Sequence, residues 1–281
     1  MQYLKTNIRT VYFFLLFFKL ITAATFATAQ GAGTPSTGGP DPIPTTSIPP
    51  NNRATHYNQI GWYAFFGTIK LSGKWSLHTE YQFRRNNLVT DWQQGLLRVG
   101  INYQVNPRVL LRAGYAWAET YAYGDIPINA LGRSFTEHRL FQMAQLSHKE
   151  GWLELQHRFM LEQRFVGRYS STAVEKEDEF PFMHRARYMI RLQAPLKGRE
   201  IKDKTAYAAV YNEIMIGFGK NVSANIFDQN RIGLLLGYRF SKTLRIEAGY
   251  LNQTLQFGRL INGRNIFQSN SGLIVNTNFS F

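Results

Sequence analysis

Side chains that alternate between apolar and polar restrict the fold of this chain more than any other feature. In residues 74–84, Trp75, Leu77 and the apolar residues after them are interleaved with Ser76, His78 and further polar residues. An alternation of period two is typical of a β-strand with one apolar and one polar face, so the pattern predicts an all-β protein. We count eleven such segments: 58–71, 74–85, 92–105, 108–121, 136–148, 151–165, 184–195, 205–217, 229–240, 243–254 and 265–281.

The connections between these segments predict the kind of β-protein. After residue 29 no stretch approaches the roughly 20 apolar residues of a membrane-spanning helix. Short turns that alternate with longer loops are the pattern of outer-membrane barrels. The short connections are 72–73, 106–107, 149–150 and 241–242, and the long ones are 86–91, 122–135, 166–183, 218–228 and 255–264.

The number of strands is constrained by parity. If the short connections face the periplasm, the last segment ends in the periplasm but the first segment begins outside. Bacterial single-chain barrels have even numbers of strands, so a strand is missed or a division is wrong. We therefore predict an antiparallel transmembrane β-barrel of about 12 strands, with 10 as the second choice.

Aromatic residues agree with a barrel. The last segment alternates up to Phe279 and Phe281, and this ending resembles the final strand of bacterial outer-membrane barrels. The resemblance implies that the barrel assembly machinery recognises Phe281. Rings near strand ends form girdles at membrane interfaces. We expect the following residues there: Trp62, Tyr63, Trp75, Tyr103, Tyr115, Trp117, Trp152, Phe165 and Tyr250. A soluble β-sandwich is the alternative, because one of its strands would show almost the same alternation.

The beginning of the chain predicts export and three regions. Residues 1–29 combine a basic start, an apolar run and a small-residue cleavage site that ends at Ala29, which together indicate a signal peptide. Residues 30–56 contain six of the ten prolines, so we expect a flexible segment. The barrel is predicted for residues 57–281. We expect the protein in the bacterial outer membrane.

The net charge of +14 raises the question of an anionic partner. The basic residues are spread along the strands, and no nucleic-acid-binding motif is present, so we expect no nucleic acid. The expected partners are outer-membrane lipid, lipopolysaccharide and the assembly machinery. The chain has no cysteine, so no disulfide can contribute.

If the apolar faces contact lipid, the polar faces line the interior. Arginine is far commoner than lysine on these faces, and a planar guanidinium can bind a carboxylate through two hydrogen bonds. Residues 80–84 and 154–158 both read Glu-x-Gln-x-Arg, so the three polar side chains of each motif share a face. We expect a lumen-lining ion-pair lattice of Glu80, Gln82, Arg84, Arg98, Arg112, Glu137, Arg139, Glu154, Gln156, Arg158, Glu162, Arg164, Arg185, Arg187, Arg191, Glu213, Arg231, Arg239, Arg245 and Glu247.

Two interpretations of this lattice remain open. Its twelve arginines outnumber its six glutamates. In one interpretation the lattice is structural and packs the lumen. In the other the surplus of arginine makes a narrow pore, a passage that favours anions or a site for an acidic solute. A membrane-embedded lipid-modifying enzyme and a surface interaction barrel are further alternatives.

Several motifs resemble the uncharacterised outer-membrane barrel family called domain of unknown function 2490. The motifs are Trp75-x-Leu77-x-x-Glu80-x-Gln82-x-Arg84, Glu137-His138-Arg139, the polar face of 154–164, Asn212-Glu213 and Asp228-Gln229-Asn230-Arg231. The resemblance covers about residues 57–281. It implies the fold and the location, and it implies no activity.

We predict no enzymatic activity, no cofactor and no metal site. A nucleophilic site needs a serine within hydrogen-bond reach of a histidine. Ser147 neighbours His148, but adjacent residues of a strand face opposite ways, and no serine lies two residues from His157. The acidic residues 175–179 could bind calcium or bridge lipopolysaccharide, although a solvated loop is the simpler expectation. The histidines considered are His138, His148, His157 and His184.

Overall fold

The structure is a computed structural model, and it describes residues 52–222 and 226–281. Every element of this part of the chain is a β-strand, which confirms the predicted fold class. The described residues include no helix long and apolar enough to cross a bilayer. The predicted signal peptide and residues 30–51 of the predicted flexible segment lie outside the described residues.

Eleven strands form one sheet, and they coincide with the eleven alternating segments. Strand β1 begins before the boundary expected at residue 57, because residues 53–56 pair with β11. The strands are β1 (Arg53–Ser72), β2 (Trp75–Asn86), β3 (Asp91–Asn106), β4 (Val109–Thr120), β5 (Phe135–Glu150), β6 (Leu153–Val166), β7 (Phe182–Pro195), β8 (Thr205–Phe218), β9 (Phe227–Arg239), β10 (Leu244–Ile261) and β11 (Arg264–Ser280).

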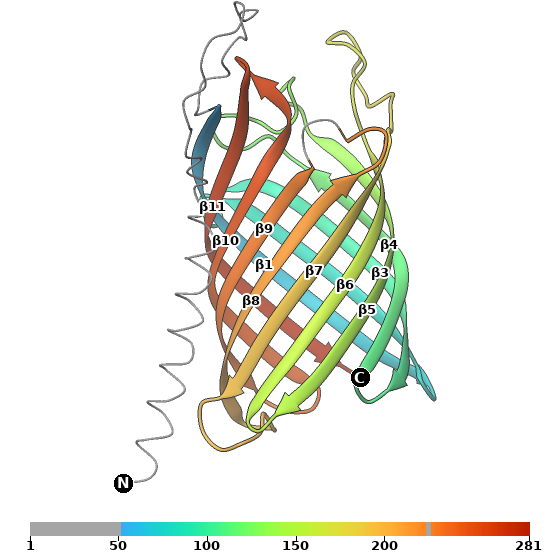
Figure 1. The fold of residues 1–281 in the computed structure, drawn as a ribbon, viewed down its shortest axis with the longest axis vertical. Helices are drawn as coiled ribbons and strands as arrows, with labels where there is room; N and C mark the ends of the chain where they lie inside the picture. Colours follow the sequence, from blue (N-terminus) through green and yellow to red (C-terminus); the bar gives the residue numbers. More distant parts are fainter. Residues whose placement is uncertain (1–51, 223–225) are drawn as a thin grey trace, which may run out of the picture. The chain divides into compact units, whose positions relative to one another are not determined.

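The sheet closes on itself into a barrel (Figure 1). Strands that follow each other in the chain pair antiparallel, but the closing strands β1 and β11 are parallel, from Arg53 opposite Asn265 to Thr68 opposite Ser280. The predictions of 12 and of 10 strands are wrong. The prediction that all neighbouring strands pair antiparallel is also wrong. In an up-and-down sheet with an odd number of strands, the first and last strands run the same way. Only a parallel seam can then close the barrel.

The two ends of the barrel differ, and we name them by their connections. The turn end carries the connections 73–74, 107–108, 151–152, 196–204 and 240–243, and Phe281 lies there. The loop end carries 87–90, 121–134, 167–181, 262–263 and the described residues 219–222 and 226 between β8 and β9. Strand β1 starts at the loop end, so β1 begins and β11 finishes at opposite ends of the barrel (Figure 1).

The connection between β10 and β11 is a tight turn, although a long loop was expected over residues 255–264. The turn consists of Asn262 and Gly263, with φ angles of 50° and 73°. Asn-Gly is the favoured pair for a two-residue hairpin, in which both residues have positive φ. The prediction of a loop was wrong because β10 continues to Ile261 and leaves only two residues for the connection.

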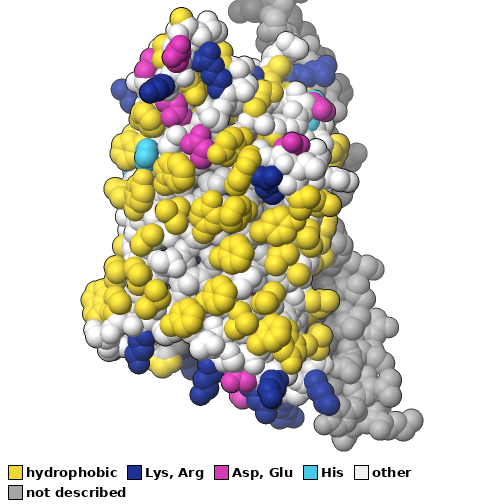
Figure 2. Space-filling model, turned by 180° about the vertical axis from the view of Figure 1, so that it is seen from behind, with side chains coloured by type: hydrophobic (Ala, Val, Ile, Leu, Met, Phe, Trp, Pro, Cys, Tyr) yellow, Lys and Arg dark blue, Asp and Glu magenta, His cyan; other side chains and the backbone are white. Residues whose placement is uncertain are grey.

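Apolar side chains face outward and polar side chains face the interior. On β3, Leu97, Val99 and Ile101 are exposed, whereas Arg98 and Asn102 are buried. Figure 2 shows the consequence on one face: apolar side chains form a band around the middle, and charged side chains gather toward the two ends. Soluble proteins have the opposite arrangement, with charged residues outside and apolar residues inside.

Part of the interior is nevertheless apolar. Ile60 and Trp62 of β1 pack in one cluster with Tyr207 and Leu235 from the opposite side of the seam. The expectation that Trp62 belongs to an interfacial girdle is therefore wrong, since its side chain is only 4% exposed. Strand parity explains the error, because Tyr63 faces outward and its neighbour Trp62 must face inward.

Two inward glycines of β9 make room for tyrosine rings. The ring of Tyr211 lies against Gly233, and the ring of Tyr207 lies against Gly237. A Cβ atom at either glycine would overlap the ring. The glycines between the arginines of this strand therefore allow aromatic residues of β8 to fill the interior.

Candidate functional site

Glu162 lies at the centre of the ion-pair lattice. Its carboxylate is fully buried and binds Arg185 at 2.6 Å and Arg187 at 2.8 Å. Arg98 lies 3.8 Å away. Glu162 belongs to β6 and Arg98 to β3, and these strands are not neighbours in the sheet. The lattice therefore crosses the interior of the barrel.

Glu213 extends the lattice toward β9. It binds Arg187 at 2.7 Å and Arg158 at 2.9 Å, and Arg231 lies 3.6 Å away. Arg187 thus links two buried carboxylates, Glu162 and Glu213. A shared arginine of this kind fits the planar guanidinium, which presents donors on several edges.

Glu137 and Asp228 extend the lattice toward the loop end. Glu137 accepts hydrogen bonds from Arg139 at 2.7 Å and from Arg164. Asp228 accepts one from Arg185 at 2.7 Å, and Arg164 lies 3.5 Å from it.

Asp228 is a member of the lattice that the sequence analysis missed. It lies an odd number of positions from Arg231, so strict alternation would place the two on opposite faces. The register between β8 and β9 shifts between Met215 and Ile216, opposite Asp228. This bulge lets Asp228 face inward together with Arg231. The sequence analysis named Asp228 in the motif Asp228-Gln229-Asn230-Arg231. The alternation, however, gave no reason to place its side chain inside the barrel.

The first Glu-x-Gln-x-Arg motif forms a continuous chain of hydrogen bonds. Glu80 binds Arg98, which is opposite it on β3, at 2.6 Å. Gln82 donates to Glu80 and accepts from Arg84 at 2.9 Å. His78 also lies 3.4 Å from Glu80.

The second motif has different partners. Glu154 accepts a hydrogen bond from Gln193 at 2.7 Å, and Arg158 reaches Glu213. Gln156 lies half-buried between them. The same three residue types therefore join different strands, because Glu80 is opposite an arginine on the next strand and Glu154 is opposite a glutamine.

The turn end holds a smaller cluster around Glu247. This carboxylate binds Arg191 at 2.5 Å and the hydroxyl of Tyr207 at 2.7 Å, and Arg245 lies 3.8 Å away.

Arg112, another predicted lattice residue, binds a neutral partner. It donates a hydrogen bond to Asn102 at 2.6 Å.

The connection 196–204 covers part of the turn end. Ile201 packs against the apolar interior cluster, and Arg239 donates to its carbonyl oxygen at 3.2 Å. Arg239 also lies 3.2 Å from Asp203. Of the predicted lattice residues, Arg239 thus binds the connection at the end of the barrel instead of an interior acid.

A cavity of about 490 Å³ lies inside the barrel at the loop end. Trp62 lies at its wall and donates to Gln93 at 2.7 Å. The guanidinium groups of Arg84 and Arg231 lie 4.0 Å and 4.8 Å from the centre of the Trp62 ring. The charged residues that line the cavity are Arg84, Arg139, Arg164, Arg168, Arg185, Arg231, Arg259, Glu137 and Asp228.

The connection 121–134 folds over this cavity. Tyr123 donates to Gln268 of β11 at 2.9 Å, and Arg259 of β10 donates to the carbonyl oxygen of Pro127 at 2.9 Å. Burial raises the pKa of Tyr123, so its hydroxyl remains a hydrogen-bond donor at neutral pH. These bonds tie the connection to the strands beside the seam.

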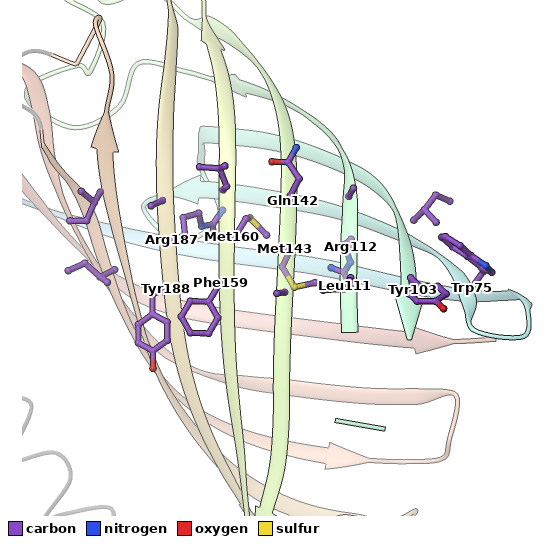
Figure 3. Close-up of a pocket in the computed structure, with 17 residues that line it drawn as sticks. Trp75, Tyr103, Leu111, Arg112, Gln142, Met143, Phe159, Met160, Arg187 and Tyr188 are labelled. Atoms are coloured by element: carbon purple, nitrogen blue, oxygen red, sulfur yellow. The ribbon is translucent and has the colours of Figure 1, made fainter. Parts of the chain in front are cut away.

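A second hollow lies on the outer wall and has a volume of about 760 Å³. Figure 3 shows Phe159 and Tyr188 on the outer side of the wall, with Leu111 and Trp75 further along it. Its lining is almost entirely apolar, and Arg187 points from the same wall into the barrel. The hollow therefore belongs to the exposed apolar outer wall, where Trp75, Leu111 and Phe159 lie.

The histidines lie among aromatic side chains. His157 hydrogen-bonds the hydroxyl of Tyr188 at 2.8 Å and stacks on His148 at 6.1 Å between ring centres. His138 bonds the hydroxyl of Tyr115 at 2.5 Å, and His184 stacks on Phe218.

No metal site emerges in residues 52–222 and 226–281, where no group of three or more potential metal ligands occurs. The acidic residues 175–179 are part of the connection 167–181. Within this connection the backbone N–H and the hydroxyl of Ser170 both donate to Asp178, and these hydrogen bonds lower the pKa of the Asp178 carboxyl. Glu177 accepts a hydrogen bond from the backbone N–H of Thr136. Asp178 therefore links two parts of the connection 167–181, and Glu177 links this connection to β5.

The comparisons with known proteins identify the family. The chain matches the family described as protein of unknown function DUF2490 over residues 59–259. The protein belongs to the DUF2490 family. This DUF2490 match spans β1 to β10 and includes Glu80, Glu137, Glu162 and Glu213. No curated protein and no solved structure matches the chain.

Proposed function

We propose that this DUF2490 protein is an integral outer-membrane barrel whose interior is closed by its own side chains. Its role in this proposal is structural, without an open pore or an enzymatic activity. One observation carries the proposal: the exposed wall is apolar, whereas the buried interior holds a network of arginines and carboxylates. A lipid environment stabilises this arrangement, and water would not.

The outer wall supports insertion into lipid. Leu97, Val99 and Ile101 of β3 are each about 40% exposed, and Figure 2 shows a continuous apolar band on one face of the molecule. Soluble monomers rarely expose a continuous apolar surface of this kind. Aromatic rings border it: Trp75 and Tyr103 lie at the turn end with their rings 4.7 Å apart. Lipid and lipopolysaccharide are the partners that such a wall would contact.

The burial of the lattice supports a closed interior. Glu162 is 0% exposed and Arg185 is 1% exposed, although both point into the barrel. An open aqueous channel would leave these charges hydrated. Phe141 and Ile201 are also buried, in the middle of the barrel and at its turn end. The interior therefore fits a packed barrel better than a passage for solutes.

The C-terminal strand fits recognition by the assembly machinery. Phe281 accepts a backbone hydrogen bond from Lys70 of β1 and donates one to Thr68 of β1. Its backbone therefore continues the pairing of β11 with β1. Its ring is 72% exposed and stacks on Phe279. An exposed aromatic end is available for binding before or during insertion.

Single-channel conductance of the refolded protein in planar bilayers tests the closed interior. We expect no steady current from protein that resists extraction from the membrane and migrates as a folded, heat-modifiable species. A second candidate, a narrow anion passage, is favoured by the surplus of arginine in the interior. A steady anion-selective current that weakens in Arg187→Glu/Arg191→Glu would establish that candidate and overturn the closed barrel.

A further inference from the structure

Two buried arginines at the loop-end cavity differ from the other arginines of the lattice. Arg84 and Arg231 are 6% and 8% exposed, and both lie within 5 Å of the centre of the same Trp62 ring. Two like charges held against the same ring repel each other in a medium that excludes water. The attraction of each cation to the indole ring offsets only part of that repulsion.

The partners of these two arginines are mostly neutral. Arg84 donates to Gln82 and Gln94, and it takes part in none of the ion pairs of residues 52–222 and 226–281. Arg231 donates to Gln229 at 2.8 Å, while its nearest carboxylate, Glu213, lies at 3.6 Å.

Arg185 shows the contrast, because it binds two carboxylates, one at 2.6 Å and one at 2.7 Å. A buried charge without a close counter-charge is costly. Glutamine at positions 82, 94 and 229 leaves the charge of Arg84 uncompensated and the charge of Arg231 only partly compensated, where glutamate would have neutralised both.

The cavity provides space for the missing counter-charge. Its volume of about 490 Å³ lies in the range of small-molecule sites. Its wall carries seven arginines and two acids, and the acids Glu137 and Asp228 are already bound by Arg139, Arg164 and Arg185. The field inside the cavity is therefore positive. Among its buried arginines, Arg84 takes part in no ion pair of the described residues, and Arg231 has only the longer contact with Glu213.

We propose that the loop-end cavity binds a small solute that carries an oxyanion, such as a phosphoryl, sulfuryl or carboxyl group, between Arg84 and Arg231. Guanidinium groups match such oxygens with paired, charge-assisted hydrogen bonds. The amides of Gln93, Gln94 and Gln253 line the same cavity and can bind further polar groups of the solute. The inference adds a ligand site to the barrel and does not depend on whether the barrel conducts ions.

Titration with inorganic phosphate, sulfate and acetate tests the site, in detergent-folded protein at constant ionic strength. Calorimetry and tryptophan emission give two independent readouts, since Trp62 contacts both arginines. We expect saturable binding, and Arg84→Gln or Arg231→Gln should weaken it about tenfold to a hundredfold. Trp62→Phe should keep the calorimetric signal and lose most of the emission change.

Arg199→Gln provides the matched control, because Arg199 is exposed in the connection 196–204 at the opposite end. It removes the same charge and should leave binding unchanged. Without added anion, Arg84→Gln should also raise the unfolding midpoint, since it removes an uncompensated charge, whereas Arg185→Gln should lower it. Absence of saturable binding to folded protein, or equal binding by the control and by Arg84→Gln/Arg231→Gln, would overturn the proposal. Binding by protein that fails to enter bilayers would reject only the membrane location.

Discussion

Glu162 has no contact with solvent and faces three arginines. At the scale of the residue, a buried carboxylate of this kind is not simply a source of stability, because burying the charges costs most of what their attraction supplies. The loss of one partner is a different matter. It leaves the remaining charges buried without compensation, and the cost of that state is large.

We therefore expect Glu162→Gln to lower the free energy of unfolding by about 3–5 kcal/mol. The amide keeps the shape of the side chain but removes the charge that Arg185 and Arg187 share. Urea unfolding in detergent micelles, followed by tryptophan emission, measures the difference.

Glu175→Gln is the control for this change. Glu175 is exposed in the connection 167–181, so the expected change lies within about 0.5 kcal/mol. Equal effects of the two substitutions would contradict a lattice that depends on Glu162.

At the scale of the element, glycine permits the close approach of strands at the seam. Gly272 of β11 is opposite Ile60 of β1, and a Cβ atom on Gly272 would overlap the carbonyl oxygen of Ile60. Gly249 has the same relation to Leu234 on β9. A small barrel needs strongly coiled strands, and glycine supplies sites where a strand can bend toward its neighbour.

We expect Gly272→Ala to reduce the yield of folded barrel and to destabilise it by roughly 1–3 kcal/mol. The added methyl group forces the two closing strands apart. The fraction of heat-modifiable protein after refolding measures the effect. Gly95→Ala is the matched control, because a Cβ atom there meets nothing within 4 Å. If both variants fold in equal yield, close approach at Gly272 is not required.

At the scale of the whole molecule, the odd strand number places the start of β1 and the end of β11 at opposite ends. The residue that precedes β1, Asn52, is at the loop end, whereas Phe281 is at the turn end. If the barrel spans the outer membrane with its short turns in the periplasm, Asn52 is at the cell surface. An even-numbered barrel would have both positions in the periplasm.

Cysteine labelling measures this topology, because the chain has no cysteine of its own. We expect a membrane-impermeant maleimide to label Asn52→Cys and Ser171→Cys on intact cells. Lys242→Cys, which lies in the connection 240–243, should react only after the outer membrane is permeabilised. Labelling of Lys242→Cys but not Asn52→Cys on intact cells would reverse the orientation, and equal labelling of all three would argue against a membrane barrel.

Local patterns predicted local structure well and irregular positions poorly. Alternation placed all eleven strands, because side-chain period is a property of each strand by itself. Two residues that face the interior, Asp228 and Trp62, were not predicted there. A bulge, which no alternation reveals, turns Asp228 inward, and Trp62 was judged by residue type instead of by strand parity. Asn262-Gly263 is a hairpin signal, but it lay within a predicted long loop and was not used.

The sequence by itself determined the strands, their two faces and the arginine-rich composition of the interior, since each follows from a repeat of two residues. Only the tertiary structure decided that eleven strands close through a parallel seam, that Glu162 meets Arg98 across the interior, and that Arg84 and Arg231 lie against the same Trp62 ring. The physical reason is distance along the chain. Contacts across a barrel join residues from distant strands, and the circumference and coiling of the closed sheet select which of them meet.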